Sequence, residues 1–194
     1  YSCGRPEVSK IDNSKINALE EPQQSEIIGK KRFIKKFGDT KLIIQSQAKY
    51  RIKARVVGVK SYLWGWDAKL APKDLALAWG ALSKNKNLQA IDFSQRNRWY
   101  YYQWGSENKL SKQYIAQHSA NNHIIPATNN LERAIKLIDE GDKVEMQGFL
   151  VNIKGLHKGE RVWWNTSLSR QDTGDGSCEV FYVIELKLGN KVYK

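Results

Sequence analysis

Apolar residues occupy every second position along several stretches of the chain, which is the pattern of strands with one buried face. In residues 50–56 they alternate with lysine and arginine, and a second alternating stretch runs along 180–188. Beside Gly58 the apolar positions shift by one residue, and the same shift occurs around Gly148 within 144–153. Such a shift at a glycine predicts that the strand bends or bulges there.

Two other segments have the spacing of amphipathic helices. Residues 72–82 begin with Pro72, which suits the first position of a helix, and carry apolar residues three and four positions apart. Residues 130–139 follow Asn129, a suitable N-cap, and end before a turn at Gly141. The apolar stripes are Leu75, Ala78, Trp79 and Leu82 in the first helix and Leu131, Ile135 and Ile138 in the second.

The order of the elements predicts the fold class. An aromatic strand is expected at 98–104, and residues 154–159 predict a hairpin connection into a strand at 161–168. The second helix is then followed by three consecutive antiparallel strands. We expect an α+β, β-rich domain, built as a curled antiparallel sheet or a small OB-like barrel with two short helices.

The N-terminal part of the chain has a different character. Residues 1–41 are polar and aperiodic, which predicts a tail or tether before a single globular domain at 42–194. Within it, residues 29–38 interleave five cations with three large apolar residues. That mixture favours adsorption to anionic membranes or phosphate, and the alternative is a basic linker whose apolar residues dock on the domain.

Composition and charge narrow the function classes. The chain has 194 residues, 41% of them hydrophobic, which excludes a fibrous or wholly disordered protein. The 32 lysines and arginines against 20 acidic residues leave a net charge of +12, so we expect an anionic partner: nucleic acid, anionic lipid or an acidic envelope polymer. No apolar run approaches the roughly 18 residues that a membrane-spanning helix requires.

The first four residues suggest processing. Because the chain begins with Tyr1, we expect a segment upstream, and the sequence from Tyr1 to Gly4 is similar to the end of a bacterial lipoprotein signal, in which Cys3 would be lipidated. The alternative is that Cys3 is an ordinary residue near a cut end. Cys178 is the only other cysteine, so a Cys3–Cys178 disulfide in an oxidising compartment is a further alternative.

Several motifs follow one another between Tyr50 and Leu186. They read LAPKDLALAWG at 70–80, SQ at 94–95, HSANNHIIPA at 118–127, GD at 141–142 and SLSRQDTGDGSCE at 167–179. In this order they resemble a family of bacterial proteins that has no settled activity. The resemblance covers about 70% of the chain, and it implies small proteins with a hydrophobic N-terminal segment, located in the cell envelope or periplasm.

The sharpest catalytic hypothesis concerns Cys178. It follows a tight loop that leads into a strand, and His118 or His123 could act as its base, with His118 the expected partner. Histidine before cysteine on a β-rich scaffold is the order of chymotrypsin-like cysteine proteases. Those enzymes place a glycine after the nucleophile, whereas here Glu179 follows, which disfavours both an oxyanion hole and a thiolate. The alternative is that Cys178 is a small buried strand residue or half of a disulfide.

A ligand pocket is expected where the 118–123 segment meets the loop before Cys178. Arg170 is the natural anchor for an anion, because its guanidinium can grip a carboxylate or phosphate with two bonds, and Asn121, His123 and Asp172 would line the pocket. The alternative is that these side chains satisfy the backbone of irregular connections. His118 and His123 lie five residues apart, and the third histidine, His157, lies in a lysine-flanked turn, so two histidines are too few for a metal site. The acidic spacing of the loop does not fit an EF-hand, and we predict no metal and no cofactor.

The run 95–104 offers stacking side chains bordered by cations, which is a pattern of single-stranded nucleic-acid binding. Alternation sends its aromatic residues to both faces of a strand, so at least one face must be core. Taken together, the sequence favours a non-catalytic binding or scaffolding module for an anionic partner. The alternatives are a hydrolase or acyltransferase that uses Cys178 and His118, and a protein that binds single-stranded nucleic acid.

Overall fold

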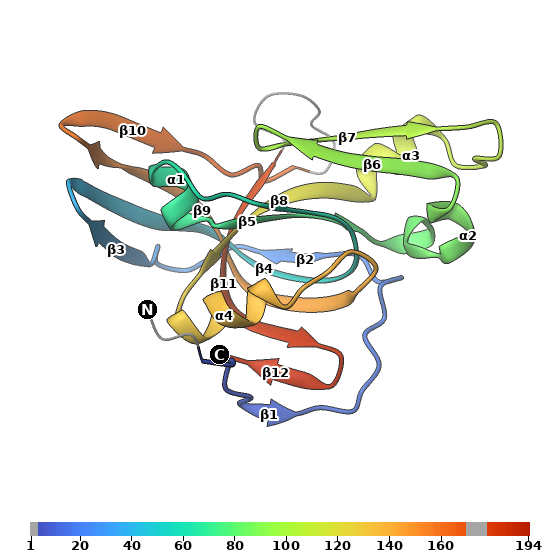
Figure 1. Ribbon diagram of the computed structural model, residues 1–194, viewed down its shortest axis with the longest axis horizontal. Helices are drawn as coiled ribbons and strands as arrows, with labels where there is room; N and C mark the ends of the chain where they lie inside the picture. Colours follow the sequence, from blue (N-terminus) through green and yellow to red (C-terminus); the bar gives the residue numbers. More distant parts are fainter. Residues whose placement is uncertain (1–3, 170–177) are drawn as a thin grey trace.

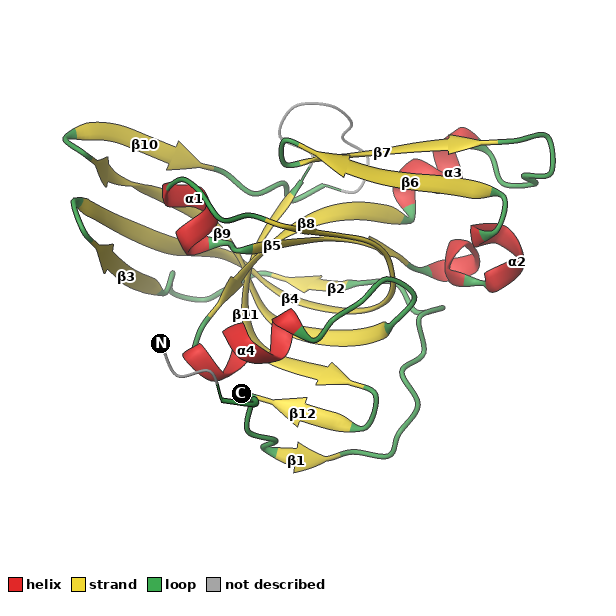
Figure 2. Cartoon of the chain, viewed as in Figure 1, coloured by secondary structure: helices red, strands yellow, loops and turns green. Residues whose placement is uncertain are grey.

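A strongly bent sheet forms the body of the protein. The computed structural model describes residues 4–169 and 178–194, and within them ten strands join in one sheet, with the order β1-β12-β11-β8-β5-β4-β9-β10 and with β2 and β3 also paired to β4 (Figures 1 and 2). A separate hairpin is formed by β6 and β7. The strands are β1 Lys10–Ile11, β2 Gln23–Ser25, β3 Arg32–Phe37, β4 Thr40–Ser61, β5 Lys73–Ala78, β6 Ile91–Arg96, β7 Trp99–Trp104, β8 Ser119–Pro126, β9 Lys143–His157, β10 Glu160–Trp164, β11 Glu179–Leu188 and β12 Lys191–Tyr193.

The helices are few and short, so the predicted β-rich α+β class is confirmed. They are α1 Trp66–Leu70, η1 Gly80–Ser83, α2 Asn85–Leu88, α3 Lys112–Gln117 and α4 Asn129–Lys136. Among the described residues, no helix has both the length and the apolar character needed to cross a membrane. The sheet closes into a partial ring but is not purely antiparallel as expected, because β8 and β11 run parallel.

The predicted bends occur where the apolar pattern shifts. β4 has a bulge between Val56 and Gly58 in its pairing with β5. Near Gly148 the register of β9 with β11 also shifts, although the extra residue lies in β11, between Val183 and Glu185. A Cβ atom on Gly148 would lie 1.9 Å from the carbonyl oxygen of Tyr182, so the strands can approach this closely only at a glycine.

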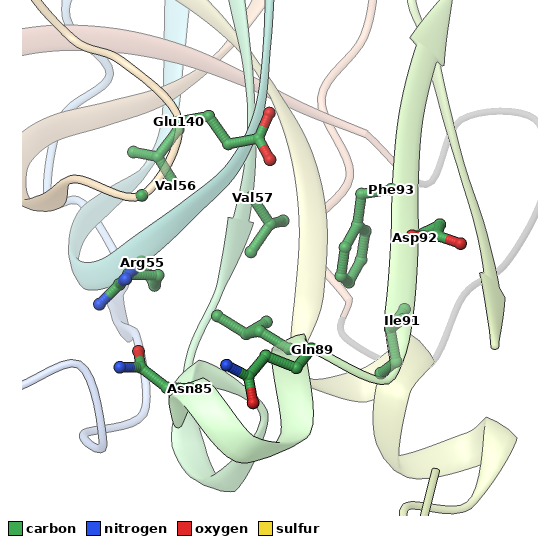
Figure 3. A pocket seen from close by; sticks show the side chains of 11 residues that line it. Arg55, Val56, Val57, Asn85, Gln89, Ile91, Asp92, Phe93 and Glu140 are labelled. Atoms are coloured by element: carbon green, nitrogen blue, oxygen red, sulfur yellow. The ribbon is translucent and has the colours of Figure 1, made fainter. Parts of the chain in front are cut away.

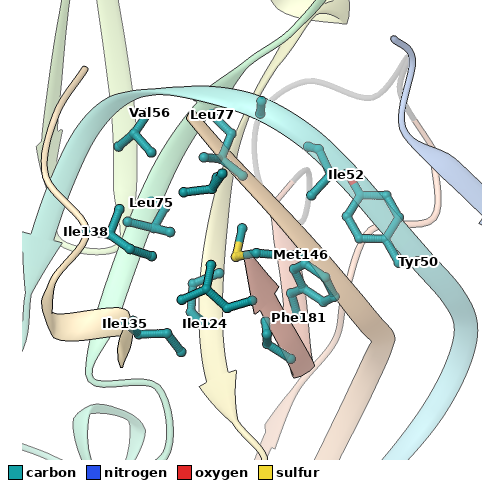
Figure 4. Packing of buried hydrophobic residues seen from close by; sticks show 14 of the residues in the cluster. Tyr50, Ile52, Val56, Leu75, Leu77, Ile124, Ile135, Ile138, Met146 and Phe181 are labelled. Carbon is teal, nitrogen blue, oxygen red and sulfur yellow. The ribbon is translucent and has the colours of Figure 1, made fainter. Parts of the chain in front are cut away.

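The larger hydrophobic core lies between the curved sheet and α4 (Figure 4). α4 confirms the second predicted helix, although the N-cap is Thr128 rather than Asn129: the Thr128 hydroxyl accepts a hydrogen bond from the backbone N–H of Leu131 at 3.1 Å. The core is formed by apolar side chains from β4, β5, β8, β9, β11 and α4, including Tyr50, Ile52, Leu75, Leu77, Ile124, Leu131, Ile135, Met146, Leu150 and Phe181.

The helix predicted over 72–82 is wrong, because residues Lys73–Ala78 form strand β5. β5 lies between β4 and β8 in the sheet, and all six of its residues are buried. Leu75 and Leu77 enter the main core, whereas Ala76 and Ala78 face a second cluster under the β6–β7 hairpin. A strand covered on both faces carries apolar residues at consecutive positions, and that pattern can coincide with helical spacing.

The N-terminal segment is part of the folded body and not a tail, so the boundary expected between residues 41 and 42 is corrected. β1 pairs with β12, and β2 and β3 pair with β4, so the predicted boundary falls inside the β3–β4 hairpin (Figure 1). Between the strands, the Lys187 ammonium donates to the carbonyl and the hydroxyl oxygens of Ser14, both at 2.7 Å. The indole N–H of Trp79 donates to Glu21 at 2.9 Å.

The basic segment 29–38 docks on the domain through its aromatic residues, which was the alternative left open above. Phe33 stacks on Tyr182 with ring centroids 4.4 Å apart, and Phe37 packs against the same cluster. Only Ile34 points outward, with 61% of its surface exposed. Arg32 and Lys36 therefore lie on the outer side of a paired strand, whereas Lys35 shares the half-buried side with the two phenylalanines.

Candidate functional site

Three adjacent strands bring polar side chains to one face of the sheet. β8 lies between β5 and β11, and His123 of β8 is opposite Asp74 on one side and opposite Val180 on the other. Cys178 precedes β11 by one residue, so the period-two alternation of strands places it on the same face as Val180 and His123. Asn121 shares this face.

Asp74 and His123 form a buried pair. The Oδ2 atom of Asp74 lies 3.0 Å from Nδ1 of His123, and the Asp74 side chain is completely buried. Within the described part of the chain, neither atom makes a hydrogen bond, and the contact between them has the distance of an ion pair. A carboxylate beside Nδ1 favours the tautomer with its proton on Nδ1, which leaves Nε2 as a proton acceptor.

Arg98 holds the other oxygen of Asp74. Its Nη1 atom donates to Oδ1 of Asp74 at 2.7 Å and to the carbonyl oxygen of Ala71 at 3.0 Å, while Nε and Nη2 donate to Asp67. The guanidinium also stacks on the ring of Tyr62 at 3.7 Å. Arg98 therefore supplies a cation beside a carboxyl group that has no contact with water.

Arg98 reaches the site from a strained turn. It follows Asn97 in the two-residue loop of the β6–β7 hairpin, and both residues adopt positive φ, 53° for Asn97 and 69° for Arg98. A left-handed conformation in a residue other than glycine costs roughly 1 to 2 kcal/mol, and its stacking and ion pairs offset that cost. Local strain of this kind is common at functional sites.

A pocket of about 330 Å³ opens beside this network. His123 and Cys178 both line it, and Cys178 is a half-buried thiol. The ring of Trp164 lies 4.5 Å from that of His123, while Trp163 is 72% exposed at the mouth. The remaining lining residues are Arg98, Trp99 and Asn165. The volume suits one compact chemical group, at the lower end of the range for ligand sites.

Two polar side chains of the pocket have N–H groups that can donate hydrogen bonds to a bound ligand. Four hydrogen bonds occupy the Arg98 guanidinium, so one of its five N–H groups, on Nη2, has no partner among the residues described. The side-chain amide of Asn165 is the second donor available in the lining. Donors of this kind can stabilise negative charge that develops on a bound carbonyl oxygen.

His118 does not meet Cys178, so the expected Cys178–His118 pair is corrected. His118 ends α3 just before β8, an odd number of residues from Asn121 and His123, and its ring turns away from their face of the sheet. It stacks on Tyr114 with centroids 3.7 Å apart, and its Nε2 atom lies 3.1 Å from Oε1 of Glu21. The histidine that shares a pocket with Cys178 is His123.

Asn121, which the sequence places in the ligand pocket, makes hydrogen bonds within the protein, and its contact with a ligand stays a prediction. Its amide oxygen accepts from Gln95 at 2.7 Å, and its amide nitrogen donates to the carbonyl oxygen of Arg98 at 2.7 Å. Both contacts clamp the β6–β7 hairpin over the sheet.

Arg170 and Asp172 lie outside the described residues, as does Cys3, so the expected anion anchor, its neighbour and the Cys3–Cys178 disulfide stay predictions.

The aromatic strand β7 is buried on one side and exposed on the other. In β7, Tyr100 and Tyr102 pack toward the sheet, and burial raises the pKa of Tyr100 strongly. Trp104 stacks on Tyr102 at 5.9 Å but is itself exposed, as is Tyr101, so the hairpin is partly core and partly surface.

Among the residues that the structure covers, no group of three or more histidine, cysteine or acidic side chains could hold a metal ion.

Sequence reasoning found Cys178 and His123 but missed Asp74, Arg98 and the two tryptophans as parts of the site. The signal for Asp74 was hidden by the helix prediction. The site draws on three of the stretches that carry the family resemblance, at 70–80, 118–127 and 167–179, although that resemblance stays a prediction.

Comparison with protein-family models, with curated proteins and with solved structures finds no match to this chain.

Proposed function

We propose that the protein is a cysteine-dependent hydrolase or acyltransferase, in which Cys178 is the nucleophile, His123 the general base and Asp74 the residue that positions it. The observation that carries the proposal is the 3.0 Å contact between buried Asp74 Oδ2 and His123 Nδ1, beside a pocket that His123 shares with Cys178. A carboxylate that contacts a histidine, with a cysteine in the same pocket, is the set of groups that acyl transfer on a thiol uses.

The chemistry follows from these positions. His123 Nε2 takes the thiol proton of Cys178, and the thiolate sulfur attacks the carbonyl carbon of an ester, thioester or amide. The resulting oxyanion is stabilised by donors in the pocket, for which Arg98 and Asn165 are available. The tetrahedral intermediate expels its leaving group, which takes the proton from His123, and a thioester on Cys178 remains. Water or an acceptor nucleophile then releases the acyl group.

The test is the pH dependence of Cys178 alkylation. In a Cys3→Ser background only Cys178 can react with iodoacetamide. We expect a thiolate that reacts below pH 7, and the variant His123→Ala should slow alkylation at that pH by about ten-fold or more. His118→Ala is the matched control, because His118 contacts Tyr114 and Glu21 instead.

The result that would overturn the proposal is equally specific. An ordinary thiol titrates near pH 8.5, so a reaction that follows such a profile and ignores His123→Ala would exclude His123 as the base. A second readout is acylation: an activated ester such as p-nitrophenyl acetate should leave an acetyl group on the Cys178 peptide. Asp74→Asn should lower that acylation while circular dichroism checks that the fold is retained.

A non-catalytic module for an anionic envelope component is the second candidate, and one surface favours it. The outer side of β3 exposes Arg32, Ile34 and Lys36 in a row, next to exposed Lys30 and Lys31. An apolar residue between cations suits an anionic lipid surface. Sedimentation with vesicles rich in phosphatidylglycerol tests this: binding should fall with salt and with Arg32→Gln/Lys36→Gln, and equal binding to neutral vesicles would exclude it.

A further inference from the structure

Two cations face each other across the sheet at the end of β4. Arg55 of β4 is directly opposite Lys143 of β9, so their side chains share one face. The next pair on that face is complementary, with Lys53 opposite Glu145. Like charges at directly opposite positions destabilise a sheet. Among the described residues, no carboxylate lies within 4.0 Å of Arg55 or Lys143 to relieve the repulsion.

Arg55 also has a buried hydrogen-bond donor without an acceptor in the described structure. Its Nε atom is buried and has no hydrogen-bond partner in the described structure. A buried guanidinium N–H without an acceptor is costly, so the position calls for an oxygen atom that the described chain does not supply. The repulsion and the orphaned donor are independent observations, and both point to an anion.

A third cation completes the site. Lys84, at the end of η1, lines a pocket of about 410 Å³ together with Arg55 and Lys143. The side-chain amide of Asn85 lies in the same lining and makes no hydrogen bond to another described residue, so it is an additional donor. Glu20 comes directly after three lining residues, Asn17, Ala18 and Leu19, but its carboxylate is paired with Lys53 at 2.8 Å.

A compartment lined by both apolar and polar groups adjoins the cations. A second pocket, of about 550 Å³, shares Arg55 and Asn85 with the first and continues between β4 and β6 (Figure 3). Its walls carry the apolar side chains of Val57, Leu88, Ile91 and Phe93, and two acidic residues, Asp92 and Glu140, also line it. The Glu140 carboxylate would repel an anion from this compartment, whereas Asp92 points to the other side of β6 (Figure 3) and the other end of the site gathers three cations.

We propose that this double pocket binds a phosphate monoester with a compact apolar body. Arg55, Lys84 and Lys143 would hold the phosphate, because three cations match a dianionic group and Arg55 can donate two parallel bonds to it. The apolar body would lie against Val57 and Phe93. The site is separate from the Cys178 pocket, since the two linings have no residue in common.

Calorimetric titration with phenyl phosphate, and with inorganic phosphate for comparison, tests the proposal. We expect phenyl phosphate to bind more tightly, and Lys143→Gln to weaken it about ten-fold, the value of one charge-assisted hydrogen bond. Lys154→Gln is the matched control, because it removes the same charge from an exposed position of the same strand, β9. Cys178→Ala should bind as the unchanged protein does, whatever the outcome for the proposed enzyme.

Three outcomes would overturn the proposal. One is the absence of binding heat for phenyl phosphate at low ionic strength. Another is an equal loss of phenyl phosphate affinity in Lys143→Gln and Lys154→Gln. That result would show that only the net charge of the protein matters, and not the position of Lys143. The third is equal affinity for inorganic phosphate and phenyl phosphate, which would show that the apolar side chains of the second pocket do not contribute to binding. Lys143 is exposed, so its variant should fold, and circular dichroism verifies this.

Discussion

The ammonium group of Lys73 donates a hydrogen bond to the carbonyl oxygen of Ile138 at 2.6 Å, inside the protein. It also donates to the carbonyl oxygens of Ile135 at 3.1 Å and Lys136 at 3.3 Å. A helix leaves its last carbonyls without intrahelical donors, so this lysine of β5 caps the C-terminal end of α4 from across the core.

Replacing Lys73 by methionine should therefore destabilise the protein. The variant keeps most of the side-chain volume but removes the donors of the buried carbonyls, and we expect a loss of about 1 to 3 kcal/mol in the free energy of unfolding. Urea denaturation measures it, with Lys49→Met on the exposed face of β4 as control. A change no larger than that of the control would show that the cap contributes nothing.

Arg98→Met should lower the free energy of unfolding more than Lys73→Met does, because it leaves the buried Asp74 carboxylate without its cation. Without the guanidinium, the fully buried Asp74 carboxylate loses its cation, and the removal of one partner of such a pair costs about 3 to 5 kcal/mol. The control is Arg96→Met, at an exposed position of β6. Thermal unfolding followed by circular dichroism compares them, and similar midpoints for both variants would contradict the role given to Arg98.

Gly148→Ala tests the close approach of β9 to β11. The added Cβ atom would collide with the backbone of Tyr182, so the strands must separate, and we expect a loss of at least about 3 kcal/mol in stability. Gly105→Ala provides the comparison, because nothing lies within 4 Å of a Cβ atom there. A stable Gly148→Ala variant would mean that the two strands can move apart without cost.

Acid should loosen the N-terminal segment. Hydrogen bonds from the hydroxyl and the backbone N–H of Ser14, together with the ammonium of Lys187, hold the pKa of Asp12 well below its ordinary value of 3.8. The pKa of Glu20 is lowered by Lys53 in the same way. A lowered carboxyl pKa stabilises the folded state above the unfolded-state value, and this contribution is lost as the pH falls through and below it.

We therefore expect amide protection of residues 9–20 to fall as the pH drops from about 5 to about 3, faster than protection in the core. Hydrogen exchange with mass spectrometry measures it. Asp12→Asn should lower protection at neutral pH and reduce its dependence on pH. If Asp12→Asn behaves like the unchanged protein at both ends of this range, the Asp12 contacts do not hold the segment.

Lys143→Gln should stabilise the protein when no anion is present. It removes the repulsion from Arg55 directly opposite, and we expect a gain of about 0.2 to 1 kcal/mol at low ionic strength. The gain should shrink as salt screens the pair. Lys154→Gln controls for net charge in the same urea titration, and a loss of stability in Lys143→Gln would show that the pair is not strained.

Much of the scaffold was predictable from local patterns. The alternation at 180–188 corresponds to β11, the capped amphipathic segment at 130–139 to α4, and the shift at Gly58 to the bulge in β4. These features depend on neighbours close in sequence or on the period of one element, so the residues themselves carry the information.

What the sequence alone determined is thus the β-rich class, the bends and the chemistry of Cys178 and His123 as separate candidates. Only the tertiary structure decided that residues 73–78 form a strand, because that depends on burial by β4 and β8 on either side. It also decided that His123, rather than His118, shares a pocket with Cys178, and that Asp74 contacts His123. Residues far apart in the chain meet in this way only when parallel and antiparallel neighbours fix their register. Pairing between distant strands is a property of the whole sheet, and no local period encodes it.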